Sequence, residues 1–100
     1  MSKLPLKLRV FDYIAHTDHP VTTDEVVEAL APEYKGEMQM KFSRIDFYLQ
    51  SLLGVNMIKQ DKVEFDNSGN VQVYYVITDF GRSRIKYIPK NKENSSRDSI

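Results

Sequence analysis

The hydrophobic positions in the first third of the chain repeat with the period of an α-helix. Over residues 5–16 the apolar side chains recur every three to four positions, and they form the stripe Leu6, Val10, Tyr13 and Ile14. A second helix is predicted over residues 23–31, because Thr22 and Glu25 have the spacing of a reciprocal capping box. Its acidic side chains are expected to form a solvent-exposed face, namely Asp24, Glu25, Glu28 and Glu33.

A third helix has the longest helical repeat in the chain. Its predicted buried stripe consists of Met38, Phe42, Ile45, Leu49 and Leu52. The helix is expected to begin at residue 37 or at residue 43, since Ser43 and Asp46 provide a second start signal. It is expected to end near Val55, with Asn56 in the place where a left-handed residue usually closes a helix.

Beyond residue 57 the apolar repeat changes from helical to alternating, which is typical of β-strands. Strands are predicted over residues 58–65 and 71–77. The five residues between them, Asp66-Asn67-Ser68-Gly69-Asn70, are strong turn formers. The two strands are therefore expected to form a hairpin.

A short last helix is predicted over residues 79–88, with Thr78 as its N-cap. Phe80 and Ile85 are expected to point into the core. Gly81 is expected to allow close packing against the rest of the domain.

The predicted order of helix, helix, helix, hairpin, helix is that of an α+β winged helix-turn-helix domain with a three-helix bundle, a two-stranded wing and a C-terminal helix. We expect one winged-helix domain over residues 1–88. Residues 89–100 are polar and have no repeat, so they are expected to form a disordered tail.

Composition excludes several classes of protein. Fourteen basic and fourteen acidic residues cancel, which counts against a strong non-specific field for nucleic acid. The chain has no cysteine, so it has neither disulfides nor a thiolate metal site. It also has no apolar run of the ~20 residues that a membrane span needs, and no apolar signal segment at its start. We therefore expect a cytoplasmic protein that does not associate with membranes.

No catalytic or metal-binding constellation is predicted. Asp79-Phe80-Gly81 matches a kinase tripeptide, but the Gly-rich loop, strand lysine and catalytic loop that kinases require are absent. His16 and His19 would need a third ligand to hold a metal, and the chain has no other histidine. The sequence therefore predicts that the protein is not an enzyme and binds no cofactor or metal.

Three segments resemble winged-helix regulators of the MarR and PadR families. HPVTTDEVVEAL resembles the opening of their second helix, YLQSLLGVNMIKQD the end of their third helix, and YYVITDFGRSRI the junction between their wing and last helix. The resemblance covers about residues 6–88. Two features depart from it: a longer connection between the second and third helices, and little positive charge on the third.

The resemblance implies binding to double-stranded DNA. The third helix would enter the major groove, where Arg44 suits guanine and Gln50 suits adenine. The wing would reach the neighbouring backbone or minor groove, and the start of the second helix would offer backbone N–H groups to a phosphate. The residues implicated are Thr22, Thr23, Met40, Lys41, Ser43, Arg44, Phe47, Gln50, Ser51, Lys62, Asn67, Ser68 and Asn70.

Two functions remain open at this point. One is a small transcriptional regulator, more readily a repressor than an activator, which acts as a homodimer paired through Leu4, Leu8, Tyr87 and Ile88. The alternative is a winged-helix module that docks on another protein, such as a phage or plasmid accessory factor. Zero net charge and the outward-facing apolar pair Met40 and Phe47 favour this alternative.

Overall fold

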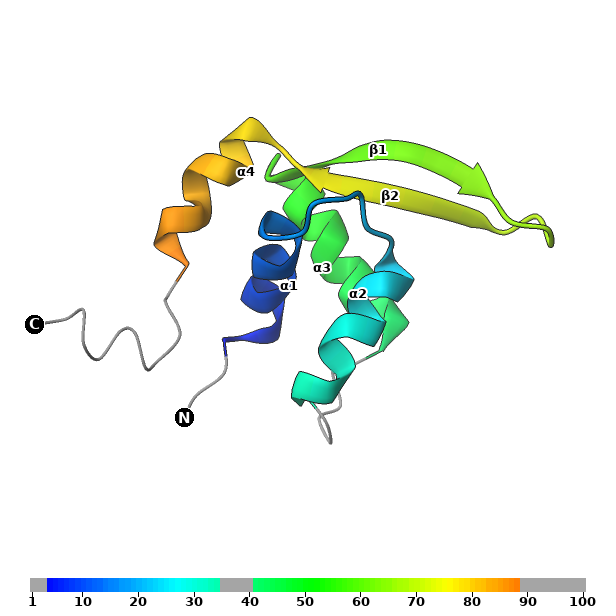
Figure 1. The fold of residues 1–100 in the computed structure, drawn as a ribbon, viewed down its shortest axis with the longest axis horizontal. Helices are drawn as coiled ribbons and strands as arrows, with labels where there is room; N and C mark the ends of the chain where they lie inside the picture. The colour runs from blue at the N-terminus through cyan, green and yellow to red at the C-terminus, as the bar shows by residue number, and fades with distance from the viewer. Residues whose placement is uncertain (1–3, 35–40, 89–100) are drawn as a thin grey trace, which may run out of the picture.

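The computed structural model describes residues 4–34 and 41–88, and it shows three helices, an antiparallel hairpin and a short final helix (Figure 1). The elements in chain order are α1 (Leu6–Ala15), α2 (Thr23–Leu30), the 3₁₀ turn η1 (Ala31–Tyr34), α3 (Phe42–Gly54), β1 (Ile58–Phe65), β2 (Val71–Ile77), α4 (Asp79–Arg84) and the 3₁₀ turn η2 (Ile85–Tyr87). The predicted α+β winged helix-turn-helix fold is confirmed. The predicted tail lies outside the described residues.

The core lies where α1, α2 and α3 meet beneath the hairpin. The predicted stripe of α1 is buried at Leu6, Val10 and Ile14, and that of α3 at Ile45, Leu49 and Leu52. Burying one such side chain contributes about 1.5–3 kcal/mol. The helical repeats of the sequence therefore identified the faces that hold the domain together.

The start of α3 lies one residue before the later of the two predicted starts, residue 43. The helix begins at Phe42, with Lys41 in extended conformation at the N-cap. Phe42 was predicted to be buried, and this is wrong, because its side chain is 52% exposed. Side chains in a helix lean toward its N-terminus, so the first residue projects past the core that covers Ile45. Met38 and Met40 lie outside the described residues.

The acidic face predicted for α2 is not simply solvated. The Thr22 hydroxyl accepts from the Glu25 N–H at 3.2 Å, which confirms half of the capping box. The Glu25 carboxylate accepts instead from the Tyr13 hydroxyl at 2.8 Å and bonds the His19 ring at 2.7 Å. Burial, followed by the bond to Glu25, raises the pKa of Tyr13. Sequence spacing could not reveal these partners, because they come from α1 and the following loop.

A second acidic residue joins η1 to α1. The Arg9 guanidinium donates to both carboxylate oxygens of Glu33 at 2.9 Å. Such paired, parallel hydrogen bonds are the stronger form of ion pair, and this one raises the pKa of Arg9. The pair links two segments that are 24 residues apart.

The hairpin has the predicted bounds and contains a β-bulge. Strand partners run from Ile58 with Ile77 to Phe65 with Val71, and the register shifts between Gln60 and Lys62. An odd number of positions separates Ile58 from Val63, so in a regular strand the two side chains would lie on opposite faces. The extra residue of the bulge brings both onto the inner face. The inner face consists of Ile58, Gln60, Val63, Phe65, Val71, Val73, Tyr75 and Ile77.

The loop before α2 pairs with the free edge of β2. Val21 and Tyr75 exchange two backbone hydrogen bonds, of 3.0 and 2.8 Å, on the edge of β2 that faces away from β1. From there the strands extend beyond α2, so that the wing projects from the helical body (Figure 1).

The junction between wing and last helix matches the prediction at Thr78 and Gly81. The Thr78 hydroxyl accepts from the Gly81 N–H at 2.8 Å. Gly81 is buried, and a Cβ built on it would collide with the carbonyl of Met57 and lie 2.8 Å from Ile77 Cγ1. Asn56 has a φ of 68°, so it is the left-handed residue expected after α3.

Phe80 was predicted to point into the core, and this is wrong. Its ring is 48% exposed, and Arg84 lies 5.8 Å from the ring centroid. The α-helix ends at Arg84, and Ile85 begins the 3₁₀ turn. In the first turn of α4, Gly81 is buried against Met57 and Ile77, whereas Phe80 lies on the side of the turn that faces solvent.

Candidate nucleic-acid interface

The outward face of α3 presents one basic and one aromatic side chain. Ser43, Arg44 and Phe47 line a shallow hollow of about 220 Å³. Phe47 is 62% exposed, and the Arg44 guanidinium has no hydrogen bond or ion pair with any described residue. These three side chains therefore lie together and open to solvent, as the sequence predicted.

The predicted DNA contacts Gln50, Ser51 and Lys41 do not line this hollow. The Gln50 amide donates to the Tyr75 hydroxyl at 2.9 Å, so it is already engaged in bracing the wing. The pKa of Tyr75 is raised, mainly because its phenol is buried. Ser51 is half-buried and Lys41 is exposed at the N-cap. The bond to Tyr75 uses one of the two amide N–H groups of Gln50, so adenine would have to be read by the amide oxygen and the other N–H.

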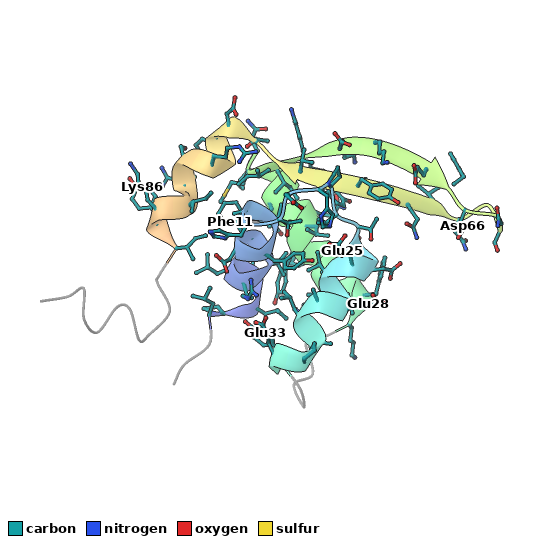
Figure 2. All side chains as sticks on the ribbon, in the orientation of Figure 1. Phe11, Glu25, Glu28, Glu33, Asp66 and Lys86 are labelled. Carbon is teal, nitrogen blue, oxygen red and sulfur yellow. The ribbon has the colours of Figure 1, made fainter. Side chains whose placement is uncertain are left out.

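The tip of the wing is organised around a carboxylate. Asp66 lies at the far end of the hairpin (Figure 2), and one oxygen accepts from the backbone N–H groups of Ser68 and Asn70 at 2.8 and 2.9 Å. These bonds lower the pKa of Asp66, and the bond from the backbone N–H of Asn70 has the largest effect. The predicted contacts Asn67, Ser68 and Asn70 are exposed beside a carboxylate that stays ionised.

The outer face of the wing carries the predicted contact Lys62. Its ammonium lies 4.6 Å from the Tyr74 ring centroid and 3.3 Å from the Glu64 carboxylate. A hydrogen bond with Tyr74, and then one with Lys62, lowers the pKa of Glu64. Much of the positive charge of Lys62 is therefore balanced within the wing.

A larger hollow, of about 310 Å³, separates the inner face of the wing from the helices. It is lined by Thr22, Thr23, Asp24, Phe42, Asp46, Asp66, Asn70, Val71, Gln72, Val73 and Tyr75. Thr23 is buried, and its hydroxyl donates to Asp46 at 3.0 Å. The Thr22 hydroxyl accepts from the Glu25 N–H in the helix cap and keeps its own O–H as a donor, so the two residues could offer a phosphate their backbone N–H groups and the Thr22 hydroxyl, but not the hydroxyl of Thr23.

Sequence reasoning missed this hollow, although part of its lining was predictable. The alternation of β2 places Val71 and Val73 on the face of Tyr75. Nothing in the sequence indicated that this face would remain open, or that Asp46 of α3 would meet Thr23 of α2.

The residues predicted to pair two subunits lie at the two ends of the described chain. Leu4, Leu8 and Ile88 are half-buried, whereas Tyr87 is 61% exposed, with the Arg84 guanidinium 4.3 Å from its ring centroid. Across residues 4–34 and 41–88, no helix has the length and apolar content to cross a bilayer, and no three His, Asp or Glu side chains converge to hold a metal ion.

Comparison with known proteins gives the fold a context. No protein-family profile matches the sequence, and no curated protein is significantly similar to it. Among solved structures, a PadR-like transcriptional regulator from Bacillus cereus is similar with a TM-score of 0.63 and 19% identity, over 94% of this chain and 84% of that one. A Streptococcus transcriptional regulator is similar with a TM-score of 0.62 and 19% identity, over 94% and 87%.

A third similar structure is that of a protein from a multidrug-resistant clinical isolate. A mutant of MepR from S. aureus has a TM-score of 0.63 and 15% identity, over 95% of this chain and 64% of that one. The chain has the winged-helix fold of these proteins.

Proposed function

We propose that the protein is a small DNA-binding transcriptional regulator that acts in the cytoplasm and presents the outward face of α3 to the major groove. The observation that carries this proposal is the exposed group Ser43, Arg44 and Phe47 on the helix that winged-helix domains use for DNA. The likeness of more than nine-tenths of the chain to regulators of known structure supports it.

Arg44 is the natural base contact. A guanidinium can donate two parallel hydrogen bonds to guanine, and Arg44 spends none of its donors on the described residues. Phe47 beside it can contact a thymine methyl group. The backbone N–H groups at the start of α2, the exposed amides of the wing tip and Lys62 would contact the sugar-phosphate backbone.

Because the protein has zero net charge, its overall electrostatic field gives little attraction to DNA, and affinity must come from specific contacts. The acidic groups at the wing tip and in the inner hollow oppose the approach of phosphates, so we expect weak binding to random DNA. A homodimer would compensate, because two half-sites are then bound together. In this proposal Leu4, Leu8, Tyr87 and Ile88 pair the subunits, and the bound dimer represses transcription by occupying its site.

Replacement of Arg44 by alanine tests the proposal. We expect Arg44→Ala to weaken binding to a selected duplex by roughly 1–3 kcal/mol, with an unchanged circular dichroism spectrum because the side chain is exposed. Lys7→Ala, which removes one exposed positive charge from α1, is the matched control and should leave affinity almost unchanged. Selection of duplexes from a random library, followed by titration at several salt concentrations, measures both effects.

The exposure of Phe47 also favours a second function, docking of α3 on another protein. Phe47→Ala separates the two, because loss of an interface anchor costs about 2 kcal/mol or more. If no duplex is selected from the library at about 50 mM salt, DNA binding is excluded as the function. A partner lost on Phe47→Ala but kept on Arg44→Ala would then establish docking.

A further inference from the structure

We propose that the hollow between α2, α3 and the inner face of the wing binds an extended peptide that adds as a strand to the open edge of β2 and directs both apolar and basic side chains into the hollow. This inference concerns a surface other than the outward face of α3. The proposed DNA contacts Thr22, Thr23 and Asn70 also line the hollow, so a bound peptide and bound DNA would compete for these residues.

The first observation is an unpaired strand edge. Val21 already pairs with the edge of β2 at Tyr75, which shows that this edge accepts a strand. Backbone groups in a strand alternate in direction, so Val71 and Val73 direct their N–H and C=O groups to the same edge as Tyr75. In the described chain neither residue has a backbone hydrogen bond outside the hairpin. A second strand can therefore continue along β2 where Val21 leaves it.

The second observation is an apolar surface without a cover. Val71 is 55%, Val63 48% and Phe65 71% exposed on the inner face of the wing, and Phe42 is 52% exposed across the hollow. Exposed apolar groups concentrated in this way are typical of interaction sites. The hollow, about 310 Å³, reaches the lower end of the range of ligand clefts, about 300–1,000 Å³.

The charge of the hollow selects the partner. Among the described residues, its lining includes Asp24, Asp46 and Asp66 and no lysine, arginine or histidine. Asp24 is exposed, and Asp46 uses one oxygen for Thr23, so both retain free acceptors, whereas Asp66 is occupied by its turn. Carboxylates beside apolar walls repel a phosphate backbone and attract lysine or arginine. A second copy of the same hollow is disfavoured for the same reason, because it would bring like charges together.

The mode of binding follows from these features together. In strand addition, backbone hydrogen bonds supply affinity and alternate side chains supply specificity. Side chains on one side of the added strand would rest on Val71, Val73 and Phe42. Alternate side chains of a strand lie on opposite faces, so the basic side chains must share the inward face of the added strand, where those near the start of α2 would meet Asp24 and Asp46.

The test uses a synthetic ten-residue peptide with blocked ends, in which valine and lysine follow each other at every second position and serine fills the positions between them, titrated into the full chain. We expect saturable one-to-one binding, with amide NMR shifts at Val71 and Val73. The same peptide with glutamate in place of lysine should bind at least tenfold more weakly. A version with alternate backbone nitrogens methylated should also lose at least tenfold, because it cannot complete the ladder.

Two matched substitutions locate the site. Val71→Lys places a positive charge in the hollow and should weaken binding of the valine-lysine peptide at least tenfold. Val55→Lys makes the same change at a residue of similar exposure, 57%, that does not line the hollow, and should have no effect. Asp46→Asn, which keeps an acceptor for Thr23, should weaken binding about threefold or more.

Several outcomes would overturn the proposal. These are equal binding of the lysine and glutamate peptides, insensitivity to Val71→Lys or to backbone methylation, and shifts confined to the Phe47 face. If duplex DNA instead of the peptide shifts Val71 and Val73, the hollow belongs to the DNA interface. If Val71→Lys abolishes self-association while the peptide does not bind, the hollow pairs two copies of the chain.

Discussion

The two halves of the wing have the same alternating pattern and opposite environments. Near the helices, Ile58, Tyr75 and Ile77 are buried at 0%, 2% and 8% exposure. Beyond the bulge, Val63 and Val71 occupy the same inner face and are 48% and 55% exposed. Alternation thus determines which face a side chain lies on, and only the reach of the helical body determines whether that face is covered.

The attachment of the inner half explains the difference. Val21 pairs with Tyr75, Gln50 donates to the Tyr75 hydroxyl, and Thr78 donates to the carbonyl of Asn56 at 2.7 Å. In the described chain the interactions of the outer half stay within the wing: its own ladder, the contacts among Lys62, Glu64 and Tyr74, and the bonds of Asp66 in the turn. The wing therefore has a base that is hydrogen-bonded to the helical body and an outer half whose inner face is apolar and exposed.

The largest expected effect contrasts one residue from each half. Tyr75→Ala should lower the free energy of unfolding by about 3–5 kcal/mol, as for other buried aromatic residues, while Val71→Ala should change it by less than about 0.5 kcal/mol. Urea denaturation followed by circular dichroism measures both. Tyr75→Phe, which removes only the hydroxyl, is the control and should cost about 1 kcal/mol. Equal effects at the two positions would show that the outer half also packs on the body in solution.

The second-largest effect is expected at Gly81, where α4 packs against the base of the wing. Gly81→Ala should cost about 1–3 kcal/mol, because the added methyl group collides with the Met57 carbonyl and forces α4 away from the start of β1. Gly54→Ala is the matched control, since a Cβ there meets nothing within 4 Å. Thermal unfolding of both variants compares them. A neutral Gly81→Ala would mean that α4 does not hold the base of the wing.

A smaller effect is expected at the N-cap of α4. Thr78→Ala should cost about 1 kcal/mol, because it removes the acceptor for the Gly81 N–H and the donor to the Asn56 carbonyl. Thr78→Ser keeps the hydroxyl and should restore most of this stability. Amide exchange at Gly81 should accelerate in the alanine variant alone. Similar exchange in both variants would argue against the hydroxyl as the cap.

The smallest effect concerns the loop that carries Val21. Hydrogen bonds to Glu25 and then to Asp18 raise the pKa of His19 above its ordinary value of 6.5. The stabilisation from protonated His19 is thus complete below pH 6.5 and is lost as pH rises through the raised pKa. We expect the difference in melting temperature between the wild type and His19→Gln to be larger at pH 5.5 than at pH 8.5. A pH-independent difference would contradict this ion pair.

Several features of the fold could be predicted because they depend on local chemistry. Thr22 and Thr78 cap helices as expected, since capping needs only a hydroxyl next to free N–H groups. Asn56 at the end of α3 and Gly69 in the hairpin turn both have a positive φ, Gly69 of 86°. Asparagine and glycine tolerate this left-handed conformation better than other residues. The strand bounds matched because turn formers separate two alternating runs.

The failures share one physical cause. Phe42 and Phe80 have the correct helical spacing for burial, and yet both are exposed. Each lies in the first turn of a helix, where burial depends on whether another element extends that far. Gln50 illustrates the converse, because a residue on an outward face was recruited by Tyr75, 25 positions away.

The sequence by itself determined the order of the elements, the faces of α1 and α3, the caps and the hairpin turn, because each depends on residues a few positions apart. Only the tertiary structure decided the partners of Glu25 and Glu33, the position of the bulge and the junction of Thr23 with Asp46. It also decided that the wing would extend past the helices and leave Val71 facing an acidic hollow. These features depend on distances between elements, and local patterns carry no information about such distances.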